Sequence, residues 1–195
     1  MKRALGSLVA SLSLFATLVA VVPPAVARAE PLPYRPDQWI KLCGLSMGCT
    51  IDPLPHPWRG KDVYNDTGRR QRVSVRMEDG EGVRFWLALQ NDGTERDTFF
   101  VKGCRGNKRF NVNNVHLGRI KGLGTADTKI TDAFKDGTAA FTFPSSLERN
   151  KRVYLTLNII APTTAEGVSY RCPVTITSKN DPERTDTVVA RMTTY

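Results

Sequence analysis

The sequence has few of the groups that enzymes use for catalysis. Only two histidines, His56 and His116, occur among its 195 residues. It also lacks a G-x-S-x-G nucleophile elbow, an H-E-x-x-H zinc helix and a P-loop. A Ser/His/Asp site assembled from distant loops stays open as an alternative, but a solvated surface histidine is the commoner role. We therefore expect a protein that is not an enzyme and that carries no cofactor and no metal.

Long apolar runs are missing beyond the first thirty residues. At the start, a basic pair precedes the apolar run Ala4–Val22, and Pro23 and Pro24 then break any helix. Ala27-Arg28-Ala29 fits the small-x-small cleavage rule, so residues 1–29 are predicted to be a secretory signal peptide. An uncleaved anchor is the alternative, because the run approaches the ~20 residues that span a bilayer. The prolines favour cleavage, and the expected product is secreted without a transmembrane anchor.

Acidic residues are outnumbered by basic ones. Loss of the signal removes three basic and no acidic residues, so the formal net charge falls from +9 to +6. Such a surplus outside the cell attracts anionic wall polymers or lipid head groups, whereas the alternative is solubility and protection of sheet edges. Nucleic acid is not an expected partner, because the signal removes the chain from it and no recognition motif is present. Basic residues gather in Arg69-Arg70-x-Arg72, Arg105-x-x-Lys108-Arg109, Arg119-x-Lys121 and Arg149-x-Lys151-Arg152.

The Gly-flanked basic loop that contains Arg105, Lys108 and Arg109 is the first candidate binding site. Trp58 is the second candidate, because it lies in a proline-rich segment beside His56, where an exposed ring can stack on a sugar. A tryptophan in such a segment more often packs down to anchor it. Trp86 lies in the most apolar predicted strand and is expected to belong to the core.

Cysteines are few, at four. An even number in an exported chain predicts disulfides. Zinc is the competing interpretation, but the spacing of Cys43 and Cys49 is too wide for a usual zinc knuckle, and Cys104 and Cys172 have no second ligand nearby. Two disulfides are therefore favoured, with three pairings possible.

Helical periodicity and internal repeats are absent, and strand-length runs recur instead. Residues 30–60 read as an extended arm, a first strand over 37–42 and a proline-rich loop, pinned by a disulfide. From residue 61 to the end, runs rich in Val, Ile, Thr and aromatic residues alternate with turn formers. The pattern predicts an all-β chain, an immunoglobulin-like antiparallel β-sandwich over 61–195. The predicted strands cover residues 62–65, 72–77, 83–90, 98–102, 110–115, 138–143, 152–160, 170–178 and 186–194, while 128–134 fits a strand or a helical turn.

The stretch Gly82–Tyr195 resembles bacterial extracellular immunoglobulin-like modules, such as the alpha-galactosidase-associated and cell-adhesion-related (CARDB) domains. The resemblance implies a sandwich fold and an interaction or accessory role, with no catalytic residues to transfer. The expected function is a non-catalytic module that binds extracellular protein or cell-wall polysaccharide; the alternative is a small extracellular hydrolase or an enzyme inhibitor. The resemblance is carried by Gln90-Asn91-Asp92-Gly93, Asp97-Thr98-Phe99, Val153-Tyr154-Leu155-Thr156-Leu157, Ala161-Pro162, Gly167-x-x-Tyr170 and Asp186-Thr187-Val188-Val189.

Immunoglobulin-like topology also selects one disulfide pairing. In that topology the strand ending before Cys104 and the strand starting near Cys172 are antiparallel neighbours. The end of one then lies beside the start of the other, within the ~5.5–6 Å between Cα atoms that a disulfide prefers. The remaining pair, Cys43 and Cys49, is joined by a short loop with two glycines. The predicted pairing is Cys104–Cys172 and Cys43–Cys49.

Overall fold

Strands dominate the computed structural model, which describes residues 31–44, 57–118, 128–145, 152–162 and 166–195. The predicted signal peptide, His56 and Cys49 lie outside these residues. Residues 31–195 belong to one compact unit. No helix in the described part of the chain is long and apolar enough to cross a membrane.

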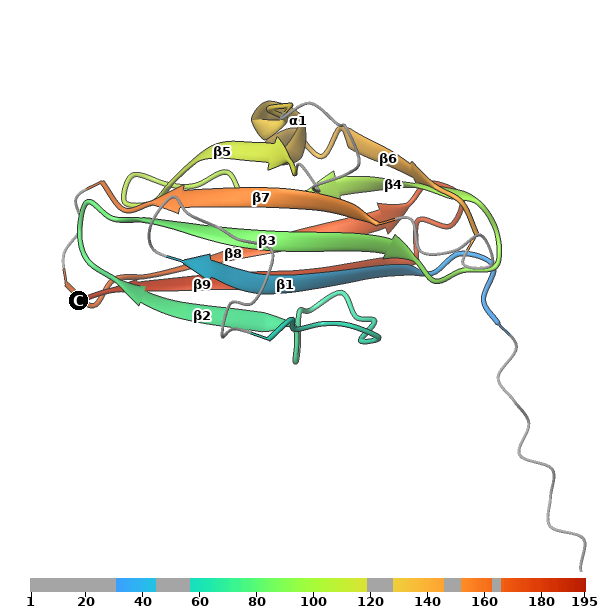
Figure 1. Cartoon of the computed structure of the whole chain (residues 1–195), viewed down its shortest axis with the longest axis horizontal. Coiled ribbons are helices and arrows are strands. Elements are labelled where there is room, and N and C mark those ends of the chain that lie inside the picture. Colours follow the sequence, from blue (N-terminus) through green and yellow to red (C-terminus); the bar gives the residue numbers. More distant parts are fainter. Residues whose placement is uncertain (1–30, 45–56, 119–127, 146–151, 163–165) are drawn as a thin grey trace, which may run out of the picture. The chain divides into compact units, whose positions relative to one another are not determined.

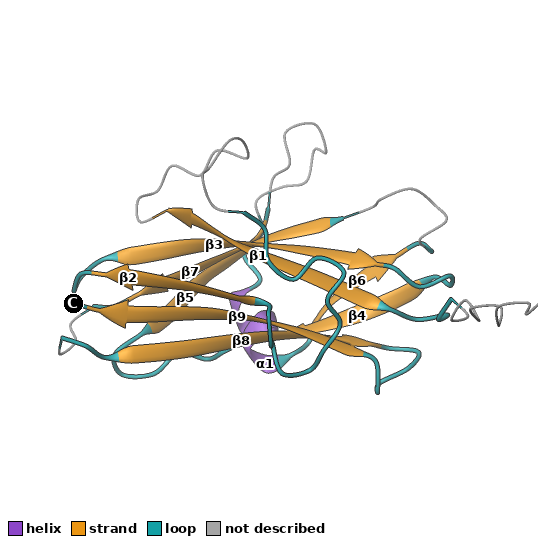
Figure 2. Ribbon diagram, turned by 90° about the horizontal axis from the view of Figure 1, so that it is seen from below, coloured by secondary structure: helices purple, strands orange, loops and turns teal. Residues whose placement is uncertain are grey.

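Two sheets pack face to face as a sandwich (Figures 1 and 2). The predicted all-β sandwich is therefore confirmed. The first sheet has the order β1 (Pro36–Gly44), β3 (Gly82–Asn91), β7 (Val153–Ile160) and β5 (Asn111–Leu117). The second sheet has the order β2 (Arg72–Met77), β9 (Thr185–Thr194), β8 (Ser169–Ser178), β4 (Asp97–Lys102) and β6 (Ala139–Phe143).

One strand pair runs in the direction that the sequence did not predict. β2 pairs with β9 in parallel, whereas the other pairings among the described strands are antiparallel. A hairpin turn forces consecutive strands to be antiparallel, but β2 and β9 lie near opposite ends of the sandwich sequence. No local turn therefore fixes their relative direction.

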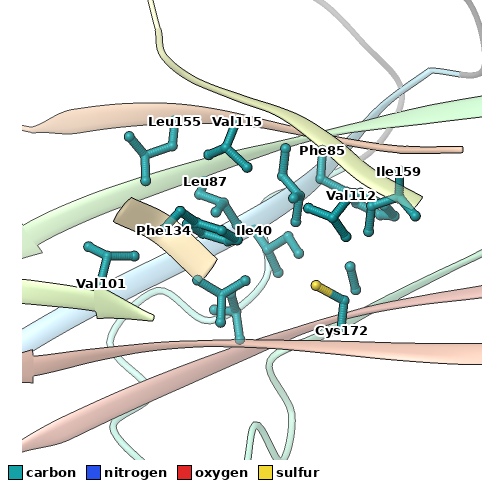
Figure 3. Packing of buried hydrophobic residues seen from close by; sticks show 14 of the residues in the cluster. Ile40, Phe85, Leu87, Val101, Val112, Val115, Phe134, Leu155, Ile159 and Cys172 are labelled. Atoms are coloured by element: carbon teal, nitrogen blue, oxygen red, sulfur yellow. The ribbon is translucent and has the colours of Figure 1, made fainter. Parts of the chain in front are cut away.

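The core lies between the sheets and follows from the period-2 pattern. Val83, Phe85, Leu87 and Leu89 of β3 are at most 1% exposed and alternate with residues of the outer face. Figure 3 shows Phe85 and Leu87 in one cluster with labelled side chains of β7, β5 and β4 and with Phe134. Phe134 is supplied by the short helix α1 (Thr131–Asp136), which resolves the segment predicted as a strand or a helical turn in favour of the helix.

The predicted strand over 62–65 is wrong. The chain turns there instead, because Val63 N donates to Gly60 O at 2.9 Å and Asp62 adopts a left-handed φ of 56°. The backbone groups of residues 62–65 do not form the hydrogen-bond ladder of a strand. They bond instead to side chains and to the backbone of β9. We call residues 60–71 the connector; they are the last part of the chain between β1 of the first sheet and β2 of the second.

Cys104 and Cys172 form a disulfide, as predicted, with their Cα atoms 5.1 Å apart. Cys104 follows β4, Cys172 lies in β8, and these strands are antiparallel neighbours. Cys43 is also disulfide-bonded. Because Cys49 lies outside the described residues, the pairing Cys43–Cys49 stays a prediction.

Candidate anion-binding groove

A groove of about 1070 Å³ lies where the connector meets the outer face of β2, β9 and β8. Six arginines line it, and we call it the arginine groove. The arginines are Arg59, Arg69, Arg70, Arg72, Arg171 and Arg191, and the remaining lining residues are Thr67, Gly68, Ser169, Tyr170 and Val189.

The strand arginines reach the groove because of the pleat of the sheet. Arg171 in β8 and Arg191 in β9 are exposed, while their neighbours Cys172, Ala190 and Met192 are completely buried in the core. Arg171 and Arg191 also stand directly opposite each other in the antiparallel ladder. Like charges in directly opposed positions destabilise a sheet. The fold therefore places two cationic residues directly opposite each other, at a cost in stability.

The connector supplies Arg69 and Arg70 on a tightly hydrogen-bonded turn. The Asn65 side-chain oxygen accepts from the backbone N–H of Thr67 at 3.2 Å and of Arg69 at 3.0 Å. Gln71 N donates to Gly68 O at 3.1 Å, and Arg70 within this turn has a φ of 66°, which is rare for a residue with a side chain. The arginine side chains are thus presented from a fixed backbone.

Gly68 brings the turn close to the sheet. Its φ is +71°, and a Cβ at this position would lie 2.4 Å from Cγ2 of Val189 in β9. Only glycine fits such an approach. From the sheet side, Arg171 Nη2 donates to Thr67 O at 2.9 Å. Connector and sheet therefore form the two walls of one groove.

A buried carboxylate anchors the connector from below. Asp186 of β9 is completely buried and accepts from Gln38 N at 2.7 Å, Gln71 Nε2 at 2.6 Å and Asn65 N at 3.2 Å. Burial raises the pKa of Asp186 to about 6, although the hydrogen bonds from Gln71 and the backbone oppose that rise. Asp186 thus ties β1, β9 and the connector together.

A second acidic group lies at the start of the connector. Carboxylate oxygens of Asp37, Asp62 and Asp92 lie within 4.8 Å of one another. They are hard oxygen ligands of the kind Ca²⁺ takes. Asp37 and Asp92 already accept hydrogen bonds from the protein: Asp37 from Trp39 Nε1 and Asp62 N, and Asp92 from Tyr64 Oη at 2.6 Å.

The charge of Asp37 is disfavoured at this place. Burial, followed by repulsion from Asp92, Asp186 and Asp62, raises the pKa of Asp37 to about 8, while the hydrogen bond from Trp39 opposes the shift. Burial and the hydrogen bond to Asp92 also raise the pKa of the Tyr64 hydroxyl. Asp37 is therefore mostly protonated at neutral pH.

The described lining of the groove is positive and carries no carboxylate. Among the lining residues that the structure describes, none is Asp or Glu. Among the described residues, the ion pairs join Lys61 to Asp62, Arg105 to Asp136 and Arg184 to Asp181, none of which lines the groove. The arginine groove therefore has a positive potential that favours an anion.

The predicted basic loop is built differently. Arg105 pairs with Asp136 of α1 at 2.9 Å, while Lys108 and Arg109 are exposed on a turn capped by Asn107. None of the three loop cations lines the arginine groove. The structure therefore does not bring the two basic surfaces together in one pocket.

Trp58 packs down as the anchoring interpretation expects. It is half-buried, and its ring centroid lies 6.1 Å from that of Trp39 and 6.2 Å from that of Tyr154. Trp86 is buried as expected, at 7% exposure, but it does not belong to the main core cluster: its Nε1 donates to Cys43 Sγ at 2.9 Å.

The sequence showed only part of the groove. Arg69-Arg70-x-Arg72 stood out as a basic cluster, whereas Arg171 and Arg191 are isolated cations twenty residues apart in the chain. The sequence signal that could have found them is their position in the strand pattern. Each arginine occupies a polar position in a strand of alternating polar and apolar residues, so each points outward from the core. Their juxtaposition depends on the register of β8 with β9, which composition does not give.

Comparisons with known proteins give only distant likenesses. No protein-family model and no curated protein matches the sequence. Among solved structures, a family 123 glycoside hydrolase from Clostridium perfringens matches with a TM-score of 0.39 and 12% identity, over 64% of this chain and 23% of the hydrolase. The N-terminal domain of PorA matches with a TM-score of 0.37 and 13% identity, over 63% of this chain and 86% of that domain.

A PapD-like domain of human CEP192 matches with a TM-score of 0.33 and 12% identity, over 77% of this chain and 95% of that domain. At these identities and TM-scores the likenesses carry no argument about activity or partner.

Proposed function

We propose that this chain is a secreted, non-catalytic interaction module that binds anionic cell-surface polysaccharide through the arginine groove. The observation that supports this most is the convergence of six arginines on a groove whose described lining residues include no acidic one. The disulfide Cys104–Cys172 and the predicted signal peptide support an extracytoplasmic location, because disulfides persist in oxidising compartments.

The chemistry of the groove supports binding rather than catalysis. Histidine, cysteine, aspartate and glutamate are absent from the part of its lining that the structure describes, and guanidinium groups stay protonated at all physiological pH values. General acid–base chemistry needs a group that titrates near the working pH. Ser169 and Thr67 have no such base beside them in the lining. The groove can hold an anion but has no group there to activate a nucleophile.

A polymer of repeated anions fits the groove better than a protein partner. The centre of a protein interface is usually apolar, with aromatic anchors in desolvated pockets. Here the ring of Tyr170 is engaged inside the molecule, stacked on Phe110 at 5.1 Å, and its hydroxyl accepts from Gly106 N. The surface that remains is charged and hydrophilic. Six arginines in one groove can instead contact several charges of one anionic polymer at once.

Heparin serves as a model anionic polysaccharide. The variant Arg171→Ala/Arg191→Ala, which removes the opposed pair, is expected to bind heparin about tenfold more weakly or worse. Two charge-assisted hydrogen-bond donors are lost in this variant. Immobilised heparin and surface plasmon resonance at several salt concentrations measure the effect. The wild-type affinity should fall as salt rises, since exposed charges are screened. A protein that does not bind heparin at low salt overturns the proposal.

The basic loop provides a matched control with more charge removed. The variant Arg105→Ala/Lys108→Ala/Arg109→Ala is expected to change heparin affinity by less than about threefold, because Arg105 already pairs with Asp136 and single exposed charges contribute little. A larger loss from the loop variant than from the groove variant would move the binding surface to the predicted loop.

A further inference from the structure

The cations of the arginine groove are of one kind. The chain contains 18 arginines and 10 lysines, yet all six basic residues in the described lining of the groove are arginines. A surface that needs only charge uses lysine as readily as arginine. Guanidinium differs because it is a planar fork that donates two parallel hydrogen bonds to one oxyanion, whereas an ammonium acts as a point charge. The composition of the groove therefore indicates recognition of oxyanion geometry.

The arrangement of two of these arginines further restricts the shape of the oxyanion that the groove can bind. Directly opposed residues on antiparallel strands have Cβ atoms about 4.5–5.5 Å apart. Arg171 and Arg191 hold this relation, so both guanidinium groups can reach one anion. A carboxylate has two oxygens and one charge, which one fork satisfies. A phosphate or sulfate ester has up to three free oxygens around a tetrahedral centre and can accept from both forks at once.

We infer that the pair Arg171 and Arg191 is a site for tetrahedral ester groups, phosphate or sulfate, carried by the polysaccharide. This inference rests on the proposed function and specifies its ligand class. The same groove is also lined by Arg72 on β2 and by Arg69 and Arg70 on the connector. These three arginines neutralise further ester groups along the polysaccharide. The opposed charges that destabilise the empty ladder become favourable when a tetrahedral anion lies between them.

Three polymers on one backbone test the inference: dextran phosphate, dextran sulfate and carboxymethyl dextran, matched in length and in charge per sugar. Isothermal titration calorimetry with the wild-type protein should give at least tenfold tighter binding of the phosphate or the sulfate polymer than of the carboxymethyl polymer. The ratio between the first two identifies which ester the site prefers. Equal affinity for all three polymers would overturn the inference while leaving the proposed function intact. Binding of none of them would overturn both.

The variant Arg171→Lys/Arg191→Lys separates geometry from charge, because it keeps both charges and removes both forks. Any lysine at position 171 also loses the hydrogen bond from Arg171 to Thr67 O, so the single variant Arg191→Lys is measured alongside the double variant. The double variant should lower the preference for tetrahedral esters to less than threefold, with binding of carboxymethyl dextran nearly unchanged. The control is Arg76→Lys/Arg96→Lys, which changes two exposed arginines that do not line the groove and should keep the wild-type preference. Circular dichroism checks that each variant is folded. A lysine pair that discriminates as well as the wild type contradicts the assignment.

Discussion

Replacing both partners of the buried disulfide, as Cys104→Ala/Cys172→Ala, is expected to lower the free energy of unfolding by about 4 kcal/mol. The bond closes a loop with a sequence separation of 68 residues. In the chain-entropy model, a cross-link of this length restricts the unfolded chain by about that amount at 25 °C. Urea denaturation of the oxidised wild type and of the double variant measures the difference.

The position of this bond adds a native-state contribution. Cys172 is completely buried among the core residues of β8, and Cys104 packs against the same cluster. The chain after Cys104 is held on β8 by Gly106 N, which donates to Tyr170 Oη at 3.0 Å. Loss of the disulfide therefore removes packing as well as a constraint, and leaves the segment before β5 with fewer attachments.

The control for this experiment is the other pair of cysteines. Cys43→Ala/Cys49→Ala should cost only about 2 kcal/mol, because the predicted loop between these residues is short. Peptide mapping without reduction tests the pairing itself. A double variant at Cys104 and Cys172 that unfolds at the wild-type urea concentration would show that the long cross-link does not limit the unfolded chain.

Strands were the part of the fold that the sequence predicted best. β2 packs one face against the core, so its sequence alternates polar and apolar residues from Arg72 to Arg76. β3 is buried over most of its length, so its sequence is an apolar run. The disulfide could be predicted because it joins neighbours in a known topology. These features depend on local periodicity and on a common arrangement of strands.

What depends on long-range pairing was not predictable. The parallel β2–β9 pair joins strands more than a hundred residues apart in the chain, and no turn residue encodes it. The segment 62–65 looked like a strand because Val63 and Tyr64 are β-formers, but hydrogen bonds to Asp186 and Asp92 hold it as a turn. The arginine groove depends on both features, so only its connector half was visible in the sequence.

The second large expected effect is a loss of stability at alkaline pH that Asp37 causes. Its pKa is about 8 in the folded protein, against an ordinary value of 3.8. Because the folded state binds more protons than the unfolded state between these values, the free energy of unfolding decreases as pH rises through this range. The stabilisation is complete below about pH 4 and is lost as pH passes about 8. Asp186, with a folded pKa of about 6, adds the same trend over a narrower range.

The substitution Asp37→Asn removes the titrating group and keeps its shape. We expect the variant to be more stable than the wild type at pH 9 by several kcal/mol, since each unit of pKa shift corresponds to about 1.4 kcal/mol. At pH 4 the variant should be the less stable of the two proteins, because Asp37 is then neutral, and one of the donors Trp39 Nε1 and Asp62 N would face the asparagine NH₂ group, which cannot accept. Urea denaturation at half-unit steps from pH 4 to pH 9 measures both curves.

Asp186→Asn is the matched contrast and should destabilise the protein at every pH in this range. Its two carboxylate oxygens accept from three backbone N–H groups and from the Gln71 amide, so an asparagine amide would place a donor against donors. The same variant should release the connector and weaken heparin binding, because Asn65 and Gln71 lose their anchor below the arginine groove.

Parallel stability curves for the wild type and Asp37→Asn would show that Asp37 titrates as an ordinary carboxylate and that its burial has no energetic consequence.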